Sequence, residues 1–339
     1  MKERYSRQIL FPQIGNSGQE KISNKHVLVL GVGALGSSIT EMLIRSGIGK
    51  LTIIDRDYVE YSNLQRQQLY NELDALQKMP KVIAAKNRLQ EINLDANIDA
   101  ILMDATVEKL EEILPTVDLI MDATDNFETR MMLNDLSQKY KIPWIYGACV
   151  GSVGMSFTII PGVTPCLNCL MNSIPMQGMT CDTGGIISPA VQMTVAHQVA
   201  EAMKILVEDQ EALRPSYMYF DLWRNQYETI KVGKIKKDTC LSCGSEPTFP
   251  FLEADQATKT SVLCGRDTVQ IRPQSKKMLD FHRLSRQLEA IGYDVSANPF
   301  LLSAEKEGSR IVFFKDGRAM VHGCKDITFA KSLYQKILG

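Results

Sequence analysis

Four cysteines stand in two pairs whose spacing is typical of metal sites. Cys166 and Cys169 form one C-x-x-C pair, and Cys240 and Cys243 form another. A single pair would equally suit a redox couple or chance, but two pairs together supply the four thiolates of a tetrahedral zinc site. Because 70 residues lie between Cys169 and Cys240, a shared ion would clip two distant segments together.

Three glycines near the start of the chain have the spacing of a nucleotide-binding turn. Gly31, Gly33 and Gly36 follow the apolar run 27–30, and Asp55 comes 24 residues after Gly31. Gly31 would permit the tight bend, Gly33 would let the backbone approach a phosphate, and Gly36 would let a helix pack closely on the strand. A carboxylate at Asp55 would reach ribose hydroxyls. The stretch indicates an adenine-nucleotide site, for which NAD is the default interpretation.

Further charged residues follow the other strands of this region, where ligands sit in doubly wound sheets. The polar segment 56–67 carries arginines, whose planar fork suits phosphate oxygens, although a surface loop with ordinary charges explains it equally well. Lys81 opens a helical pattern, where a bound anion would offset its unfavourable position. Asp125 follows the apolar run 117–122 and is placed to hold Mg²⁺ together with a nucleotide.

The periodicity around these residues predicts an α/β fold with a Rossmann-like, mostly parallel sheet and an antiparallel extension. Strands are expected at 27–30, 51–54, 98–103, 117–122, 143–150 and 154–160, with strand and turn over 216–232. Helices are expected at 81–92, 108–114, 128–140 and 190–207.

The composition changes after the second cysteine pair, which divides the chain into parts. Residues 1–246 are expected to form the nucleotide and zinc domain, and the polar, Pro-containing stretch 247–259 a linker. Residues 260–339 would form a small α+β module, with strand 268–272, helix 277–291, strand 300–305, a hairpin turning at Asp316-Gly317 and helix 326–338.

Overall composition is that of an ordinary globular protein of 339 residues with a net charge of −1. This balance gives no basic patch for nucleic acid. The start of the chain lacks an apolar signal region, and no run of about 20 apolar residues is present. We therefore expect a cytoplasmic location with neither nucleic acid nor membrane as partner, where disulfides are rare among the eight cysteines.

In this order and combination, the motifs resemble the MoeB/ThiF adenylyltransferases, which are relatives of ubiquitin-activating enzymes. The resemblance rests on Arg4-Tyr5-Ser6-Arg7-Gln8, the GVGALG turn, Asp55, Asn63-Leu64-Gln65-Arg66-Gln67, Lys81, Ala123-Thr124-Asp125-Asn126 and the two C-x-x-C pairs. It covers residues 1–246, and with its C-terminal module the chain looks like the family members of Gram-positive bacteria.

The resemblance implies an enzyme that uses ATP and Mg²⁺ to adenylate the C-terminal Gly-Gly carboxylate of a ubiquitin-like sulfur carrier and releases pyrophosphate. By matching motif, the nucleotide would contact Gly31, Gly33, Ala34, Gly36 and Asp55. Asn63, Arg66 and Lys81 would face the phosphates, Asp125 the Mg²⁺, and Cys166, Cys169, Cys240 and Cys243 would hold Zn²⁺. Because the family works as homodimers, Arg7 would reach into the partner subunit's site.

Two features stay open within the resemblance. Cys181 matches a crossover-loop cysteine, for which sulfur transfer, covalent linkage to the carrier and no chemical role are all alternatives. The carrier would be ThiS, of thiamine thiazole biosynthesis, or MoaD, of molybdopterin biosynthesis. The loop around Cys181 and the C-terminal module favour ThiS. A cysteine desulfurase or another sulfur donor would be a further partner.

Two interpretations from other classes compete with adenylation. An NAD-dependent oxidoreductase explains the glycine turn but leaves Arg66, Asp125 and the paired cysteines without a role. A non-catalytic scaffold would be expected to lack ATP-binding residues, which are present here.

The chemistry of adenylation agrees with the residues found. The carrier's carboxylate is already a nucleophile, so the reaction needs in-line placement and charge neutralisation, not a catalytic triad.

Overall fold

The computed structural model describes residues 3–171, 184–253, 260–263, 268–273 and 278–338. The chain divides into two compact units, one made of residues 1–178 and 185–253 and the other of residues 179–184 and 254–339. Each unit has its own sheet and hydrophobic core. None of the described helices combines the length and apolar character needed to span a lipid bilayer.

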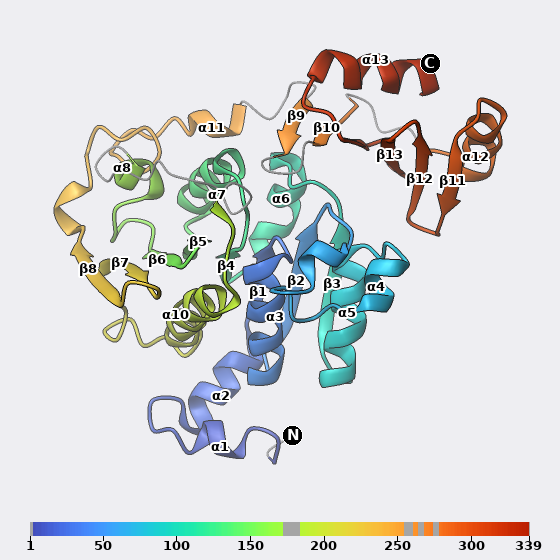
Figure 1. The fold of residues 1–339 in the computed structure, drawn as a ribbon. Coiled ribbons are helices and arrows are strands. Elements are labelled where there is room, and N and C mark those ends of the chain that lie inside the picture. The colour runs from blue at the N-terminus through green and yellow to red at the C-terminus, as the bar shows by residue number, and fades with distance from the viewer. Residues whose placement is uncertain (1–2, 172–183, 254–259, 264–267, 274–277, 339) are drawn as a thin grey trace. The chain divides into compact units, whose positions relative to one another are not determined.

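The first unit is built on an eight-stranded sheet with the order β3-β2-β1-β4-β5-β6-β7-β8 (Figure 1). The first five strands in this order run parallel, and β6, β7 and β8 continue the sheet in antiparallel fashion. The strands are β1 His26–Leu30, β2 Lys50–Asp55, β3 Asn97–Leu102, β4 Leu119–Asp122, β5 Trp144–Val150, β6 Val153–Ile159, β7 Ser216–Asp221 and β8 Gln226–Lys231. This confirms the predicted fold class.

Helices cover both faces of this sheet, which explains why its parallel strands are continuous apolar runs. Val27 and Val29 of β1 face the core shared with α3 and α10, which lie side by side in Figure 1. Leu28 and Leu30 face the opposite core, shared with α6 and α7. The helices are α1 Ser6–Ile9, α2 Gly15–Asn24, α3 Ala34–Ser46, α4 Glu72–Leu76, α5 Lys81–Ile92, α6 Val107–Ile113, α7 Phe127–Tyr140, α8 Leu167–Met171, α10 Ser188–Leu206 and α11 Pro250–Glu253.

The second unit is an antiparallel sheet with two helices. Its strand order is β11-β12-β13-β14-β10-β9. The strands are β9 Thr260–Leu263, β10 Thr268–Ile271, β11 Asp294–Ala297, β12 Leu301–Lys306, β13 Ser309–Phe314 and β14 Ala319–His322, and the helices are α12 Phe281–Ala290 and α13 Ile327–Leu338. Leu284 and Leu288 of α12 and Ala330 of α13 pack into its core. The predicted hairpin is present, with Gly317 in the left-handed region at φ 88°.

Three details differ from the expectation for this unit. β9 lies ahead of the first strand that was expected, at 268–272. The helix expected from 277 begins at Phe281, because Asp280 caps it by accepting hydrogen bonds from the backbone N–H groups of His282 and Arg283. β11 was not expected, because it is short and mostly exposed and therefore has no apolar run to mark it.

Candidate functional site

The glycine turn connects β1 to α3 and is held in place by Asp55 at the end of β2. The Gly31 N–H donates to the Ile54 carbonyl oxygen at 2.8 Å. The Val32 N–H donates to one carboxylate oxygen of Asp55 at 2.6 Å, and the Asp57 N–H donates to the other at 2.7 Å. The structure thus brings the predicted ribose ligand against the predicted phosphate turn.

Two of the glycines are required by close backbone packing. A Cβ at Gly31, whose φ is 85°, would lie 2.6 Å from the Ala123 carbonyl oxygen, and a Cβ at Gly36 would lie 1.9 Å from the Gly31 carbonyl oxygen. Gly33 differs, because the nearest described atom to its Cβ position is the Gln67 side-chain nitrogen at 3.8 Å. The backbone at Gly33 therefore leaves room beside the start of α3.

Lys81 and two carboxylates form a buried charge cluster next to this turn. The Lys81 ammonium lies 3.1 Å from a carboxylate oxygen of Asp57, and its side chain is 4% exposed. Burial raises the pKa of Asp55, and Asp57 raises it further, while Lys81 and the backbone N–H groups of Val32 and Asp57 oppose the change. Lys81 thus lies near the phosphate turn but already has an anionic partner.

Asp125 lies in the loop after β4 and interacts electrostatically with Arg56, from the predicted segment 56–67, and with Arg130, which sequence reasoning missed. Arg130 of α7 pairs with Asp122 at 3.0 Å and donates to the Thr124 carbonyl oxygen at 2.6 Å, which fixes the loop. Burial alone would lower the pKa of Arg130, but Asp122 outweighs this and raises it above the ordinary value, with a contribution from Asp125. Asp125 itself is exposed.

Arg56, the residue after β2, also interacts electrostatically with Asp125. Its guanidinium lies 3.3 Å from Asp104, which follows β3. Burial disfavours its charge, but Asp104, then Asp57 and Asp125, raise its pKa above the ordinary value. The carboxyl ends of β2, β3 and β4 therefore present alternating charges around one edge of the sheet.

The segment after β2 carries Asn63 and Arg66. Asn63 is buried and accepts a hydrogen bond from the Glu60 N–H at 3.1 Å, so its side chain serves the local turn. Arg66 is half-buried, and its guanidinium donates to the Ser62 carbonyl oxygen at 2.9 Å. Tyr70 ties the segment to the glycine turn, because its hydroxyl donates to the Val32 carbonyl oxygen at 2.6 Å.

Arg7 lies away from these residues in the same chain. It is exposed on α1, and the neighbouring Gln8 donates to the carbonyl oxygen of Ser46, the last residue of α3. The glycine turn lies at the other end of α3, whose 13 residues extend about 20 Å. The structure therefore does not bring Arg7 to the rest of the predicted site.

The four paired cysteines converge on one point. The sulfur atoms of Cys166, Cys169, Cys240 and Cys243 all lie within 4.8 Å of one another. Burial raises the pKa of the Cys169 thiol to about 11, whereas hydrogen bonding from Cys166 lowers that of Cys243 to about 5. Because four thiolates this close repel one another, their charged form needs a cation, and the donor set fits zinc.

Helix α7 supports both cysteine segments. The Asn134 side-chain oxygen accepts from the Leu167 N–H at 2.7 Å, next to Cys166. Asp135 accepts from the Phe251 N–H at 3.0 Å and hydrogen-bonds to Ser242, between Cys240 and Cys243. Both side chains are fully buried. The same helix carries Arg130, so it links the cysteine cluster to the Asp125 loop.

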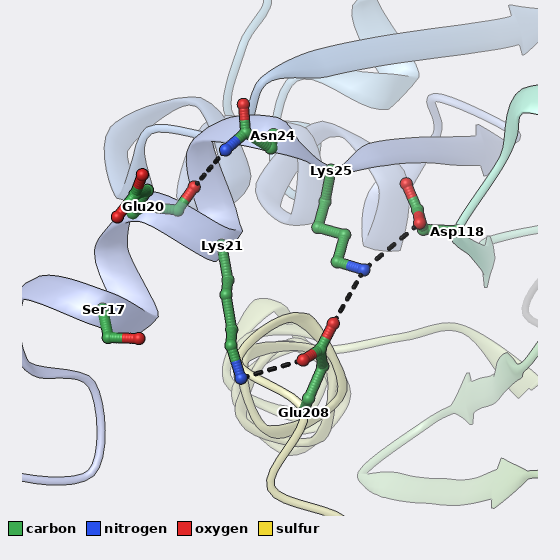
Figure 2. Close-up of a pocket in the computed structure, with 7 residues that line it drawn as sticks. All are labelled: Ser17, Glu20, Lys21, Asn24, Lys25, Asp118 and Glu208. Carbon is green, nitrogen blue, oxygen red and sulfur yellow. Dashed lines mark hydrogen bonds and ion pairs between the residues drawn. The ribbon is translucent and has the colours of Figure 1, made fainter.

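Cys181, the remaining predicted site residue, falls outside the described residues. A further feature lies apart from the predicted site. A surface pocket of about 310 Å³ is lined by residues of α2 and by Lys25, Asp118 and Glu208, which lie just before β1, just before β4 and just after α10 (Figure 2). Glu208 binds Lys21 at 2.8 Å and Lys25 at 3.2 Å, and Lys25 also binds Asp118 at 3.4 Å. These ion pairs connect α2 and the residues that flank β1, β4 and α10, at the amino ends of the strands and opposite the glycine turn. Because the side chains are partly exposed, the pairs contribute little stability.

Comparison with known proteins agrees with this architecture. A model of the ThiF family matches residues 5–242. The sulfur carrier protein ThiS adenylyltransferase of Bacillus subtilis (strain 168) is 48% identical over 339 residues, the whole of both chains. The molybdopterin-synthase adenylyltransferase of Haemophilus influenzae is 38% identical over 231 residues, covering 68% of this chain and 94% of the relative.

The structural comparison concerns the fold. The crystal structure of E. coli MccB with ATP is similar with a TM-score of 0.62 at 22% identity, covering 72% of this chain and 75% of that chain. The match of the family model spans most of the chain, includes the glycine turn, the charged loops and three of the four cysteines, and ends one residue before Cys243. The chain belongs to the ThiF family.

Proposed function

We propose that this protein transfers the adenylyl group of ATP to the C-terminal Gly-Gly carboxylate of a ThiS-type sulfur carrier and releases pyrophosphate. The observation that carries the proposal is the position of Asp55 and Lys81 beside the glycine turn, with Asp125 in the loop after the neighbouring strand β4. The full-length similarity to a ThiS adenylyltransferase supports the choice of carrier.

In this proposal the protein positions two reactants and neutralises charge. Backbone N–H groups at the start of α3 hold phosphate oxygens beside Gly33, and Asp55 binds the ribose. Arg66 and Lys81 stabilise negative charge on the α-phosphate and the leaving pyrophosphate. The exposed carboxylate of Asp125 would hold Mg²⁺, which would supply positive charge against the phosphates when bound.

The position of Arg7 supports a homodimer as the working form. Arg7 is exposed and lies at the far end of α3 from the glycine turn, so it reaches no phosphate site in its own chain. In a dimer its guanidinium would complete the partner's site. An Arg7→Ala chain mixed with an Arg66→Ala chain would then recover part of the activity, because one of the two sites in the mixed dimer is intact.

The cysteine cluster has a structural role in this proposal. Zinc bound by four thiolates has no open position for catalysis, so it would join two segments and not take part in adenylation. Residues 260–339 form a candidate docking module for the carrier or a downstream enzyme. If removal of residues 260–339 leaves the carrier affinity unchanged, that docking role is excluded.

Cys181 is tested separately. Full sulfur transfer by a Cys181→Ser variant would exclude a chemical role for Cys181.

The decisive test for the carrier uses ThiS and MoaD separately. Each is mixed with the protein, ATP and Mg²⁺, and mass spectrometry follows formation of the AMP–carrier conjugate. Faster conjugation of ThiS supports the proposal. Faster conjugation of MoaD would favour the second candidate, which the similarity to a molybdopterin-synthase adenylyltransferase keeps in view.

A further inference from the structure

Arg130 of α7 holds the loop that carries Asp125. Its guanidinium lies 3.0 Å from a carboxylate oxygen of Asp122, the last residue of β4. It also donates to the carbonyl oxygens of Thr124 at 2.6 Å and of Gly147, in β5, at 3.1 Å. One planar side chain therefore joins the end of β4, the loop after it and the neighbouring strand β5.

Asp122 holds the same loop through its other carboxylate oxygen. This oxygen accepts hydrogen bonds from the Thr124 N–H at 2.9 Å and from the Thr124 hydroxyl at 2.7 Å. Asp125, one residue further on, is exposed, and its carboxylate accepts a hydrogen bond from the side chain of the adjacent Asn126 at 3.4 Å. The position of Asp125 thus depends on the loop backbone, which Asp122 and Arg130 hold in place.

Stability alone does not explain a buried ion pair of this kind. The side chain of Asp122 is fully buried and that of Arg130 is 8% exposed, so both charges have left water. Their attraction returns only part of that cost, and an apolar pair of similar size often gives an equally stable protein. Fixing one conformation is another use of such a pair. Arginine suits this use, because its planar fork of N–H donors contacts the carboxylate and both carbonyl oxygens at once.

We propose that Arg130 is a positioning residue that keeps the 122–125 loop in the conformation from which Asp125 binds Mg²⁺ together with ATP. The inference rests on the proposed function, in which Asp125 is the Mg²⁺ ligand, and it assigns to Arg130 no contact with the nucleotide. If only a fraction of the molecules holds the loop in this conformation, the apparent dissociation constant rises by the inverse of that fraction. Loss of the arginine fork should therefore weaken ATP binding only when Mg²⁺ is present.

The test compares Arg130→Lys with Arg214→Lys. Arg214 is the matched control, because its guanidinium also donates to two carbonyl oxygens, those of Ser156 in β6 and Ser216 in β7. Dissociation constants for ATP are measured by calorimetry, once with saturating Mg²⁺ and once with EDTA. For Arg130→Lys we expect the constant with Mg²⁺ to rise about tenfold, which corresponds to a correctly placed loop in about one molecule in ten. The constant with EDTA should stay within about twofold, and Arg214→Lys should change neither constant.

A double-mutant cycle with Asp125→Asn separates positioning from a general structural effect. If Arg130 acts through Asp125, Arg130→Lys should change the constant with Mg²⁺ by less than about twofold in the Asp125→Asn background. Losses that multiply in the double variant, or an equal loss with EDTA, would overturn the proposal. A wild type whose ATP affinity does not depend on Mg²⁺ would overturn it as well.

A second variant covers the case in which Arg130→Lys does not fold. Arg130→Met combined with Asp122→Asn removes both buried charges together, so that neither is left unpaired. It should show the same loss of ATP affinity with Mg²⁺ and none with EDTA, and an unchanged affinity with Mg²⁺ would contradict the assignment. A wild-type protein that shows the expected Mg²⁺ dependence but adenylates no carrier would refute the proposed function alone.

Discussion

Lys81 and Arg66 are both predicted to face the phosphates, yet their surroundings differ. Lys81 is buried and paired with Asp57, so it must exchange part of that ion pair for a phosphate. Arg66 makes its described hydrogen bond to the carbonyl oxygen of Ser62 in its own turn, and the guanidinium retains donors for a ligand. At the scale of single residues, Arg66 is therefore the cleaner probe of phosphate chemistry.

We expect Arg66→Ala to lower ATP–pyrophosphate exchange at least about 100-fold, the range seen when one charge-stabilising group is removed. Its effect on the melting temperature should be small, because only a local hydrogen bond is lost. Arg88→Ala, at an exposed position on α5, is the control and should exchange normally. Unchanged exchange in Arg66→Ala would refute the assignment.

His26 at the start of β1 makes stability depend on pH. Its ring nitrogens lie 2.9 Å from the Thr116 carbonyl oxygen and 2.8 Å from the Thr52 hydroxyl, so the neutral ring is fully bonded. Burial lowers its pKa below the ordinary value of 6.5, as it does for His197. The unfolded chain therefore binds more protons in the range just below pH 6.5.

It follows that the free energy of unfolding should fall as the pH decreases below about 6.5. His26→Gln should flatten this dependence and leave the part due to His197, which urea titrations between pH 5 and 7.5, roughly the range in which histidine titrates, would measure. The exposed His282→Gln serves as control. A slope that is the same in wild type and His26→Gln would contradict the account.

At the scale of elements, the sequence predicts β1, the glycine turn, α3 and β2 because their signals are local: apolar runs, glycine spacing and a terminal carboxylate. The spacing of the cysteines also predicts that the two C-x-x-C pairs come together at one site. The sequence does not predict that Arg130 pairs with Asp122 or that Gln67 faces Gly33, because those contacts join residues that only the folded sheet brings together. Nor could spacing show that Lys81 is paired with Asp57.

The close fit of β1 and α3 gives a prediction about the turn itself. Gly36→Ala would place a methyl group 1.9 Å from the Gly31 carbonyl oxygen, so the strand and helix must move apart. We expect the free energy of unfolding to drop by at least about 2 kcal/mol, as for an overpacked site. Gly233→Ala is the matched control, because no described atom lies within 4 Å of its Cβ position. Equal stability of the two variants in urea would exclude this packing argument.

The cysteine cluster and α7 form a second testable element. Metal analysis should find about one zinc per chain, and Cys240→Ser should lose it. Asp135→Asn should weaken zinc binding by about 10–100-fold, because Asp135 orients the segment around Ser242. The exposed Asp95→Asn is the control. The cobalt-substituted protein would report a distorted thiolate site by its visible spectrum, and a zinc-free wild type would contradict the prediction.

At the scale of the whole molecule, the two units have different support. The ThiF family model covers residues 5–242, which include every described residue of the predicted nucleotide site. The similarity to the Bacillus subtilis protein continues through residues 260–339. Family membership also changes the interpretation of the glycine turn, which alone suggests NAD and in its charged surroundings indicates ATP.

The most direct test of this interpretation follows the phosphates of ATP. The protein is incubated with a carrier ending in Gly-Gly, Mg²⁺ and ATP labelled either at the α-phosphate or at the γ-phosphate. Attack at the α-phosphate transfers the α-label to the carrier and releases the γ-label as pyrophosphate. A carrier that stays unlabelled, or γ-label released as inorganic phosphate, would contradict the account.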